Sequence, residues 1–117
     1  MAVLLISFCT ILLLVFFSPA ASYAATPMLK MLLAPSCPAC ASMELVLNDL
    51  DKDYAGKVAT EKINLLEHRE IAKQYNVRYV PHLLFLDANG SVFKEEVGVL
   101  SLDEVLQRFK EAGVNIK

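Results

Sequence analysis

The chain has 117 residues, of which 56% are hydrophobic and 21% charged, and its formal net charge is −2 at pH 7. This length favours one domain. The slightly acidic balance, without any cluster of Lys and Arg, argues against a protein that binds nucleic acid. The sequence contains no Gly-rich phosphate loop, no nucleophile elbow, no internal repeat and no low-complexity tract.

The N-terminal segment is strongly apolar, since no charged side chain occurs before Lys30. Residues 2–17 form a hydrophobic run with the length of a signal-peptide core, which is short for a membrane span. Small residues follow in SPAASYAAT, as is typical of a signal peptidase site, and we expect cleavage after Ala24. Because no basic residue precedes the run, the alternative is that residues 2–17 remain as an uncleaved anchor.

Either outcome divides the chain into a leader, residues 1–24, and an exported domain, residues 25–117. We expect this domain in the periplasm or another extracytoplasmic space, with the membrane involved only through an uncleaved leader. Cys9 lies within the leader. The domain keeps Cys37 and Cys40, an even number of cysteines, as is usual outside the cytosol.

The first half of the domain predicts a strand, a helix and a second strand. Residues 28–34 are a short, nearly continuous apolar run, typical of a buried strand. Pro35 ends this strand, and Pro38 stands where a helix begins, because its fixed φ and missing N–H are tolerated there. We expect the helix to end near Asp51 and residues 57–64 to form the next strand. The inward-facing stripe of the helix consists of Met43, Val46, Leu47 and Leu50.

The second half predicts a helix, a hairpin and a last helix. Residues 66–75 form the first of these helices. Residues 83–86 and 91–95 are strands joined by Asp87-Ala88-Asn89-Gly90, in which Asn-Gly is a strong hairpin signal. The segment Ser101-Leu102-Asp103-Glu104 is a capping box that begins the last helix. Its expected inward-facing residues are Val105, Leu106, Phe109 and Ala112.

The resulting order of elements is β-α-β-α-β-β-α. The β-α-β unit requires a right-handed crossover between parallel strands, whereas the hairpin adds an antiparallel pair. We therefore expect an α/β domain with a mixed four-stranded sheet and helices on both faces, preceded by an apolar leader helix.

The stretch Pro-Ser-Cys-Pro-Ala-Cys places Cys37 and Cys40 at the junction of the first strand and the first helix. Two cysteines at this spacing can bind a metal, close a small loop, or cycle between dithiol and disulfide. With the pair in this place, the chain resembles the thioredoxin-like superfamily over nearly the whole domain, as a small exported member with a CPAC motif.

Three further positions carry the resemblance. Val80-Pro81 precedes the third strand, where the family has a cis-proline beside the cysteines. Gly98 follows the hairpin, where thioredoxins have a glycine that lines the substrate groove, and Lys62 lies at a position that is often Lys in thioredoxins. The resemblance implies that Val80, Pro81 and Gly98 bind substrate, with the Val80 backbone pairing with an extended segment as an added strand. A trans-proline that merely begins a strand is the simpler alternative for Pro81.

The sequence also departs from the family pattern. Ser36 replaces the tryptophan that precedes the first cysteine, and Pro-Ala replaces Gly-Pro between the cysteines. Met43 stands where many members have a helix-kinking proline. Met31 replaces a buried aspartate that, in thioredoxins, manages the proton of the resolving thiol.

The two cysteines are expected to have different roles. At the N-terminus of the helix, unpaired N–H groups and the helix dipole favour the Cys37 thiolate, and so lower its pKa below the free value of about 8.5. Cys37 would then attack a substrate disulfide, and the shielded Cys40 would resolve the mixed disulfide. An inert structural staple is the alternative, although a bridge across so short a loop stabilises the fold little.

Three residues are candidates for tuning the pKa of these thiols. Lys62 and Glu44 are candidates for the proton function that Met31 cannot perform, and Glu44 shares a helix face with Cys40, although an exposed helix residue is its simpler interpretation. His82 follows the proline and is either a tuning residue or a third metal ligand, unless strand alternation points it away from the cysteines.

The function that we predict is an exported, monomeric thiol-disulfide oxidoreductase, with no cofactor beyond the Cys37–Cys40 disulfide. Its partners would be protein thiols and disulfides and an unidentified redox protein, and a reductase or assembly role is slightly favoured because no helical subdomain is inserted. One alternative is a metal-binding or metal-delivery module that uses Cys37, Cys40 and His82. Another is a binding module that keeps the fold without catalysis.

Overall fold

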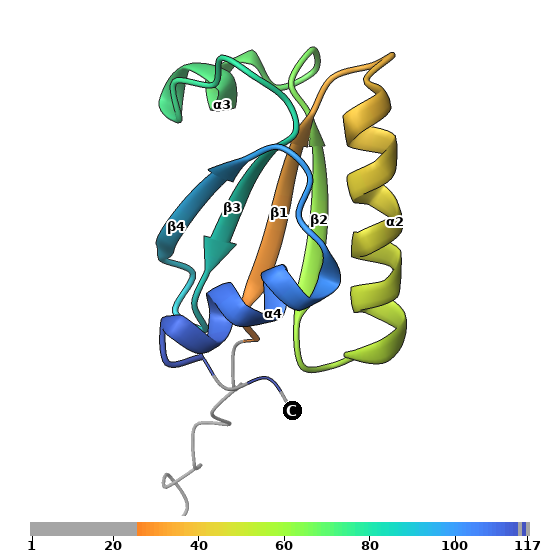
Figure 1. Ribbon diagram of the computed structural model, residues 1–117. Coiled ribbons are helices and arrows are strands. Elements are labelled where there is room, and N and C mark those ends of the chain that lie inside the picture. Colours follow the sequence, from red (N-terminus) through yellow and green to blue (C-terminus); the bar gives the residue numbers. More distant parts are fainter. Residues whose placement is uncertain (1–25, 115, 117) are drawn as a thin grey trace, which may run out of the picture.

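The computed structural model describes residues 26–114 and 116. The elements follow one another in the predicted order (Figure 1): β1 (Met28–Leu33), α2 (Pro38–Asp53), β2 (Ala59–Asn64), α3 (Arg69–Gln74), β3 (His82–Leu86), β4 (Val92–Val97) and α4 (Leu102–Glu111). The predicted leader and its cleavage site lie outside the described residues. Within the described part of the chain, no helix combines the length and the apolar character that crossing a bilayer requires.

The strands form the predicted mixed four-stranded sheet, in the order β2-β1-β3-β4. Strand β1 is parallel to β2 and antiparallel to β3, and β3 is antiparallel to β4. The parallel pair requires a crossover, which α2 provides on one face of the sheet (Figure 1). The two central strands are the most apolar, and every residue of β3 is buried. The prediction of the sheet is thus confirmed.

Alternate residues of the central strands build two cores. Leu29 and Met31 of β1 and Leu83 and Phe85 of β3 face the helices α2 and α4. The buried members that these helices contribute are Met43, Leu47, Leu50, Val105 and Phe109. On the other face, a smaller cluster of Leu32, Ile63, Leu84 and Leu86 packs against residues of α3 and the loop after it. Helices therefore cover both faces, as predicted.

A bulge in β4 gives the main core an additional aromatic ring. Leu86 pairs with Val92 but Phe85 pairs with Lys94, so Phe93 is the extra residue in the ladder. Its ring lies 6.1 Å from that of Phe85 and 5.8 Å from that of Phe109. In the turn before it, the Asp87 carboxylate accepts the N–H groups of Asn89 and Ser91.

Apart from shifts of one or two residues at the ends of strands and helices, two local predictions differ from the structure. Helix α3 begins at Arg69 rather than at residue 66, because Asn64 accepts the Leu66 N–H and holds a turn there. Ala112, predicted to face inward, is exposed, because α4 ends at Glu111. The N–H groups of residues 113 and 114 return to the carbonyls of residues 110 and 109, which closes the helix in a Schellman motif.

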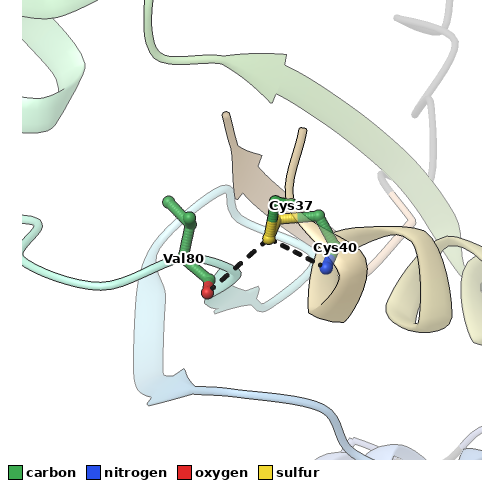
Figure 2. The surroundings of a disulfide bond; sticks show 3 residues. All are labelled: Cys37, Cys40 and Val80. Carbon is green, nitrogen blue, oxygen red and sulfur yellow. Dashed lines mark hydrogen bonds between the residues drawn. A yellow bond between two sulfur atoms is a disulfide. The ribbon is translucent and has the colours of Figure 1, made fainter. Parts of the chain in front are cut away.

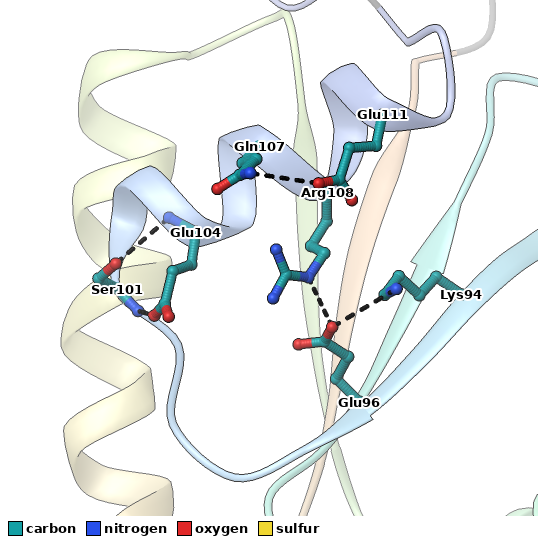
Figure 3. Close-up of polar contacts among 7 residues, drawn as sticks. All are labelled: Lys94, Glu96, Ser101, Glu104, Gln107, Arg108 and Glu111. Atoms are coloured by element: carbon teal, nitrogen blue, oxygen red, sulfur yellow. Dashed lines mark hydrogen bonds and ion pairs between the residues drawn. The ribbon is translucent and has the colours of Figure 1, made fainter.

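Helix α4 is held by a capping box at its start and by an ion pair with β4 along its side (Figure 3). The predicted capping box is present: the Ser101 hydroxyl accepts the Glu104 N–H at 3.2 Å, and the Glu104 carboxylate accepts the Ser101 N–H at 2.8 Å. Hydrogen bonding by Ser101 lowers the pKa of Glu104 below its ordinary value of 4.5. The bond from the Ser101 N–H has the largest effect, and the Ser101 hydroxyl has the next largest. Farther along, the Arg108 Nε donates to Glu96 of β4 at 2.6 Å.

We predict that Glu104→Gln lowers stability only where the carboxyl group is ionised. Because the pKa of Glu104 is lower in the folded chain, its charge stabilises the fold above the ordinary value of 4.5, and this contribution is lost as the pH falls through the folded value. Urea unfolding at several pH values should therefore show a difference from the wild type that disappears in acid. Ser101→Ala, which should cost about 1 kcal/mol, is the reference for losing the cap itself. A Glu104→Gln deficit that is constant with pH would contradict this account.

Candidate active site

The two cysteines lie where β1 ends and α2 begins (Figure 2). Ser36, with φ of 59°, turns the chain, and Cys37 then takes the N-cap position of α2 in extended geometry. The Cys40 N–H donates to the Cys37 Sγ at 3.0 Å, so this sulfur satisfies one of the free N–H groups of the first turn. Pro38 occupies the first turn, where no N–H is required of it.

Cys37 and Cys40 form a disulfide, and their surroundings differ. Cys40 is only 5% exposed and belongs to the buried face of α2, whereas Cys37 is half-buried and its neighbours Ser36 and Pro38 are exposed. A reagent therefore reaches Cys37 from solvent before it can reach Cys40. The structure places the two sulfurs in the arrangement that a two-step exchange needs.

Val80 and Pro81 lie directly beside this disulfide. The Val80–Pro81 peptide bond is cis, as the family resemblance implied. The Val80 carbonyl oxygen lies 3.9 Å from the Cys37 Sγ (Figure 2), within reach of an S–H at that sulfur once the disulfide is reduced. Strand β3 starts at the next residue and pairs with β1, so the sheet itself holds the proline loop against the cysteines.

Gly98 completes the same cluster from the end of β4. Its N–H donates to the Pro81 carbonyl at 2.9 Å, which ties the residue after β4 to the proline loop. Gly98 has φ of +102°, a conformation that favours glycine, and a Cβ placed on it would meet no atom within 4 Å. The space above Gly98 is thus open, and Cys37, Val80, Pro81 and Gly98 form one continuous site.

Exposed apolar side chains lie next to the residues of this site in the chain, and the sequence analysis missed them. Tyr79 is 72% exposed, and Val97 and Val99, on either side of Gly98, are also exposed. Exposed apolar groups that gather at one place typically mark a contact surface. The available signal was their position in the chain, next to Val80 and Gly98, but the sequence does not show that they face solvent.

Lys62 of β2 lies between Met31 of β1, its partner in the sheet, and Glu44 of α2, with which it forms a hydrogen bond. Met31 is fully buried and stands opposite Lys62 in the β1–β2 register. The Lys62 Nζ donates to the Glu44 Oε1 at 2.7 Å across the gap between β2 and α2. Both charged side chains are about half exposed, at 44% for Lys62 and 46% for Glu44. Two of the three tuning candidates, Lys62 and Glu44, therefore form one ion pair.

His82 is oriented away from the α2 face of the sheet. It pairs with Leu32 and Val97, alternates with the inward-facing Leu83, and is buried. Its Nε2 lies 3.4 Å from the Glu95 Oε1, and its Nδ1 has no hydrogen-bond partner among the described residues. Within residues 26–114, no three His, Cys, Asp or Glu side chains are grouped as metal ligands would be. The predicted set of Cys37, Cys40 and His82 is thus not assembled as a metal site.

Comparison with known proteins supports the resemblance to the thioredoxin-like superfamily. The sequence model of the family described as Thioredoxin matches residues 16–111. Thioredoxin C-2 of Corynebacterium nephridii is 36% identical over 75 residues, which cover 64% of this chain and 68% of that protein. The chloroplastic M-type thioredoxin of Spinacia oleracea is 39% identical over 67 residues, 57% of this chain. The match covers only 36% of the spinach protein, so this chain spans about a third of that relative.

The fold has equally clear relatives among solved structures. The solution structure of an uncharacterized thioredoxin-like protein from Clostridium perfringens has a TM-score of 0.69 at 24% identity, and the match covers 81% of this chain and 77% of the other. Thioredoxin-2, a component of the malaria parasite protein secretion machinery, also has a TM-score of 0.69, at 20% identity, and the match covers 74% of this chain and 84% of the other. At these identities the structures establish the shared fold.

Proposed function

The chain belongs to the thioredoxin family, and from this premise we propose that it is a protein-disulfide oxidoreductase that works through Cys37 and Cys40. The observation that supports this most directly is the Cys37 sulfur at the N-cap of α2, where it receives the Cys40 N–H at 3.0 Å. An N–H that points at the sulfur stabilises its negative charge after reduction, and a thiolate is the nucleophile of disulfide exchange.

The exchange needs only these two sulfurs. The Cys37 thiolate attacks one sulfur of a substrate disulfide, and the other substrate sulfur leaves as a thiolate. Cys40 then attacks the Cys37 sulfur, which forms the Cys37–Cys40 disulfide and releases the second substrate thiolate. The protein becomes oxidised as the substrate is reduced, and the reverse sequence oxidises a substrate dithiol.

The surroundings of the cysteines suit an extended protein segment as substrate. Val80, beside the cysteines, offers its backbone to an added strand, and Pro81 is buried behind it. The open space at Gly98 leaves room for such a segment, while Tyr79, Val97 and Val99 offer it apolar contacts. We therefore assign substrate binding to Val80, Pro81 and Gly98, together with this apolar rim.

We predict that Cys37→Ser abolishes disulfide exchange, because a serine hydroxyl is not ionised near neutral pH. Cys40→Ser should still attack but should accumulate a mixed disulfide with the substrate, visible as a mass increase that dithiothreitol reverses. Reduction of insulin, with the two variants and the wild type compared, measures both effects. As a control on access, iodoacetamide should modify Cys37 before Cys40 in the reduced wild type. A Cys37→Ser protein that reduced insulin at the wild-type rate would refute the proposal.

For the direction of the reaction we propose a reductase or assembly role, in which the protein keeps thiols of other exported proteins reduced. In support, the described chain runs from β2 to β3 through the six-residue helix α3 alone, without an inserted helical domain. Equilibration of the Cys37–Cys40 couple with glutathione should give a potential near about −270 mV, the value of thioredoxin, whereas a value near about −120 mV would assign the opposite, oxidising role.

We also propose that the domain is exported, because the leader has an apolar core followed by a small-residue cleavage region. Expressed in full in a bacterium with a periplasm, the protein should appear there with Ala25 as its first residue. Ala24→Arg should block this cleavage. Recovery of the full chain from the cytosol alone would contradict export, and a periplasmic protein that kept residues 1–24 would instead identify an anchor.

A further inference from the structure

The Cys40 thiol must lose its proton before it can resolve a mixed disulfide, and its surroundings oppose this. Cys40 is 5% exposed, and the buried residues on the α2 face of the sheet, among them Met31 and Met43, are apolar. Such surroundings disfavour a thiolate. The one buried polar side chain among the described residues is His82, which lies on the other face of the sheet. A proton acceptor must therefore reach Cys40 from the surface.

We propose that Glu44, held in place by Lys62, accepts the proton of Cys40 during resolution. This inference rests on the proposed function and adds a proton acceptor and a positioning residue to it. Glu44 is the first acidic residue of α2 after Cys40 and follows it by one helical turn. Residues four apart lie on the same helix face, about 5–6 Å apart between Cβ atoms. Helical side chains also tilt toward the N-terminus, which inclines Glu44 back toward Cys40.

Lys62 keeps the carboxylate over the sheet. Its Nζ donates to the Glu44 Oε1 at 2.7 Å from the strand next to Met31, on the face that α2 covers. Without this bond the Glu44 side chain is free to extend into solvent, away from the sulfur. Of the elements packed around Glu44, β2 contributes Lys62, and β1 contributes the uncharged Met31. The next acidic residues of α2, Asp49 and Asp51, stand more than one turn farther along.

The proposed step is balanced in protons and electrons. The Cys40 proton passes to the Glu44 carboxylate, with a water molecule as bridge. The Cys40 thiolate bonds to the Cys37 sulfur, and the bond between Cys37 and the substrate sulfur breaks with its electron pair on the substrate. The half-exposed Glu44 then returns the proton to solvent, from which the substrate thiolate takes one.

The two chemical steps can be timed separately with an aromatic disulfide that releases a coloured thiolate. When the reduced full chain is mixed with an excess of this probe, the attack by Cys37 releases the first thiolate and the resolution by Cys40 releases the second. Glu44→Gln should leave the first step unchanged and slow the second by about 10²-fold near neutral pH, the lower end of a general-base contribution. The deficit should shrink as the pH rises above about 8.5, the free value of a thiol, because the thiol then needs less help from a base to ionise.

Matched variants separate proton transfer from helix docking. Asp51→Asn makes the same chemical change on the same helix and weakens a bond of 2.6 Å from the Thr60 hydroxyl of β2, because it removes the negative charge of the acceptor, but it lies three turns from Cys40. It should resolve at the wild-type rate. Glu44→Asp should recover part of the rate, and Lys62→Met should slow resolution less than Glu44→Gln does. Circular dichroism of each variant establishes that it is folded.

Two results would overturn the inference. One is a second step at the wild-type rate in Glu44→Gln, and the other is an equal slowing in Asp51→Asn, which would assign the effect to loss of helix docking. In either case a wild type that releases both thiolates leaves the proposed function intact. A wild type that releases neither refutes the proposed function, and this inference with it.

Discussion

The bond from the Cys40 N–H to the Cys37 sulfur is the contact on which the site depends. It makes a side chain of the site into the N-cap of the longest described helix, so that the start of α2 and the position of the sulfur are fixed together. Pro38 helps, because it requires no hydrogen bond in the first turn. The apolar stripe of α2 then anchors the helix on the sheet. The partial exposure of Cys37 and the burial of Cys40 both follow from where this helix begins.

The sheet brings the second half of the site to this point. Strands β1 and β3 are neighbours and antiparallel, so β1 ends where β3 begins. The residues just outside these two ends, Cys37 and Val80, therefore meet although they are 43 positions apart in the chain. The end of β4 is held at the same place by the bond between Gly98 and Pro81. The site thus lies where the ends of three strands come together, and the fully buried strand β3 holds them in place.

Local signals in the sequence predicted most of this arrangement. The apolar runs of β1 and β3, the stripe of α2 and the capping box of α4 each depend on residues close together in the chain, and all are present. Ala112 was predicted wrongly because the apolar spacing of α4 continues one residue beyond the end of the helix at Glu111, into the Schellman motif. The features that the sequence could not show depend on distant residues. The ion pair of Glu44 with Lys62 requires α2 to lie over β2, and the exposure of Tyr79 depends on what packs around it.

The bulge at Phe93 lets the two ends of β4 direct their side chains to different faces of the sheet. At the hairpin end, β4 must supply an aromatic ring to the core, whereas at the other end it must direct Val97 outward beside Gly98. Without the bulge, Phe93 would pair with Phe85 in place of Lys94. Each later side chain of β4 would then point to the opposite face of the sheet, because side chains alternate between the two faces along a strand. Glu95 and Val97 would then point toward the helices, and Glu96 would lie beside His82. One additional residue in β4 thus lets the strand supply Phe93 to the core at one end and expose Val97 beside Gly98 at the other.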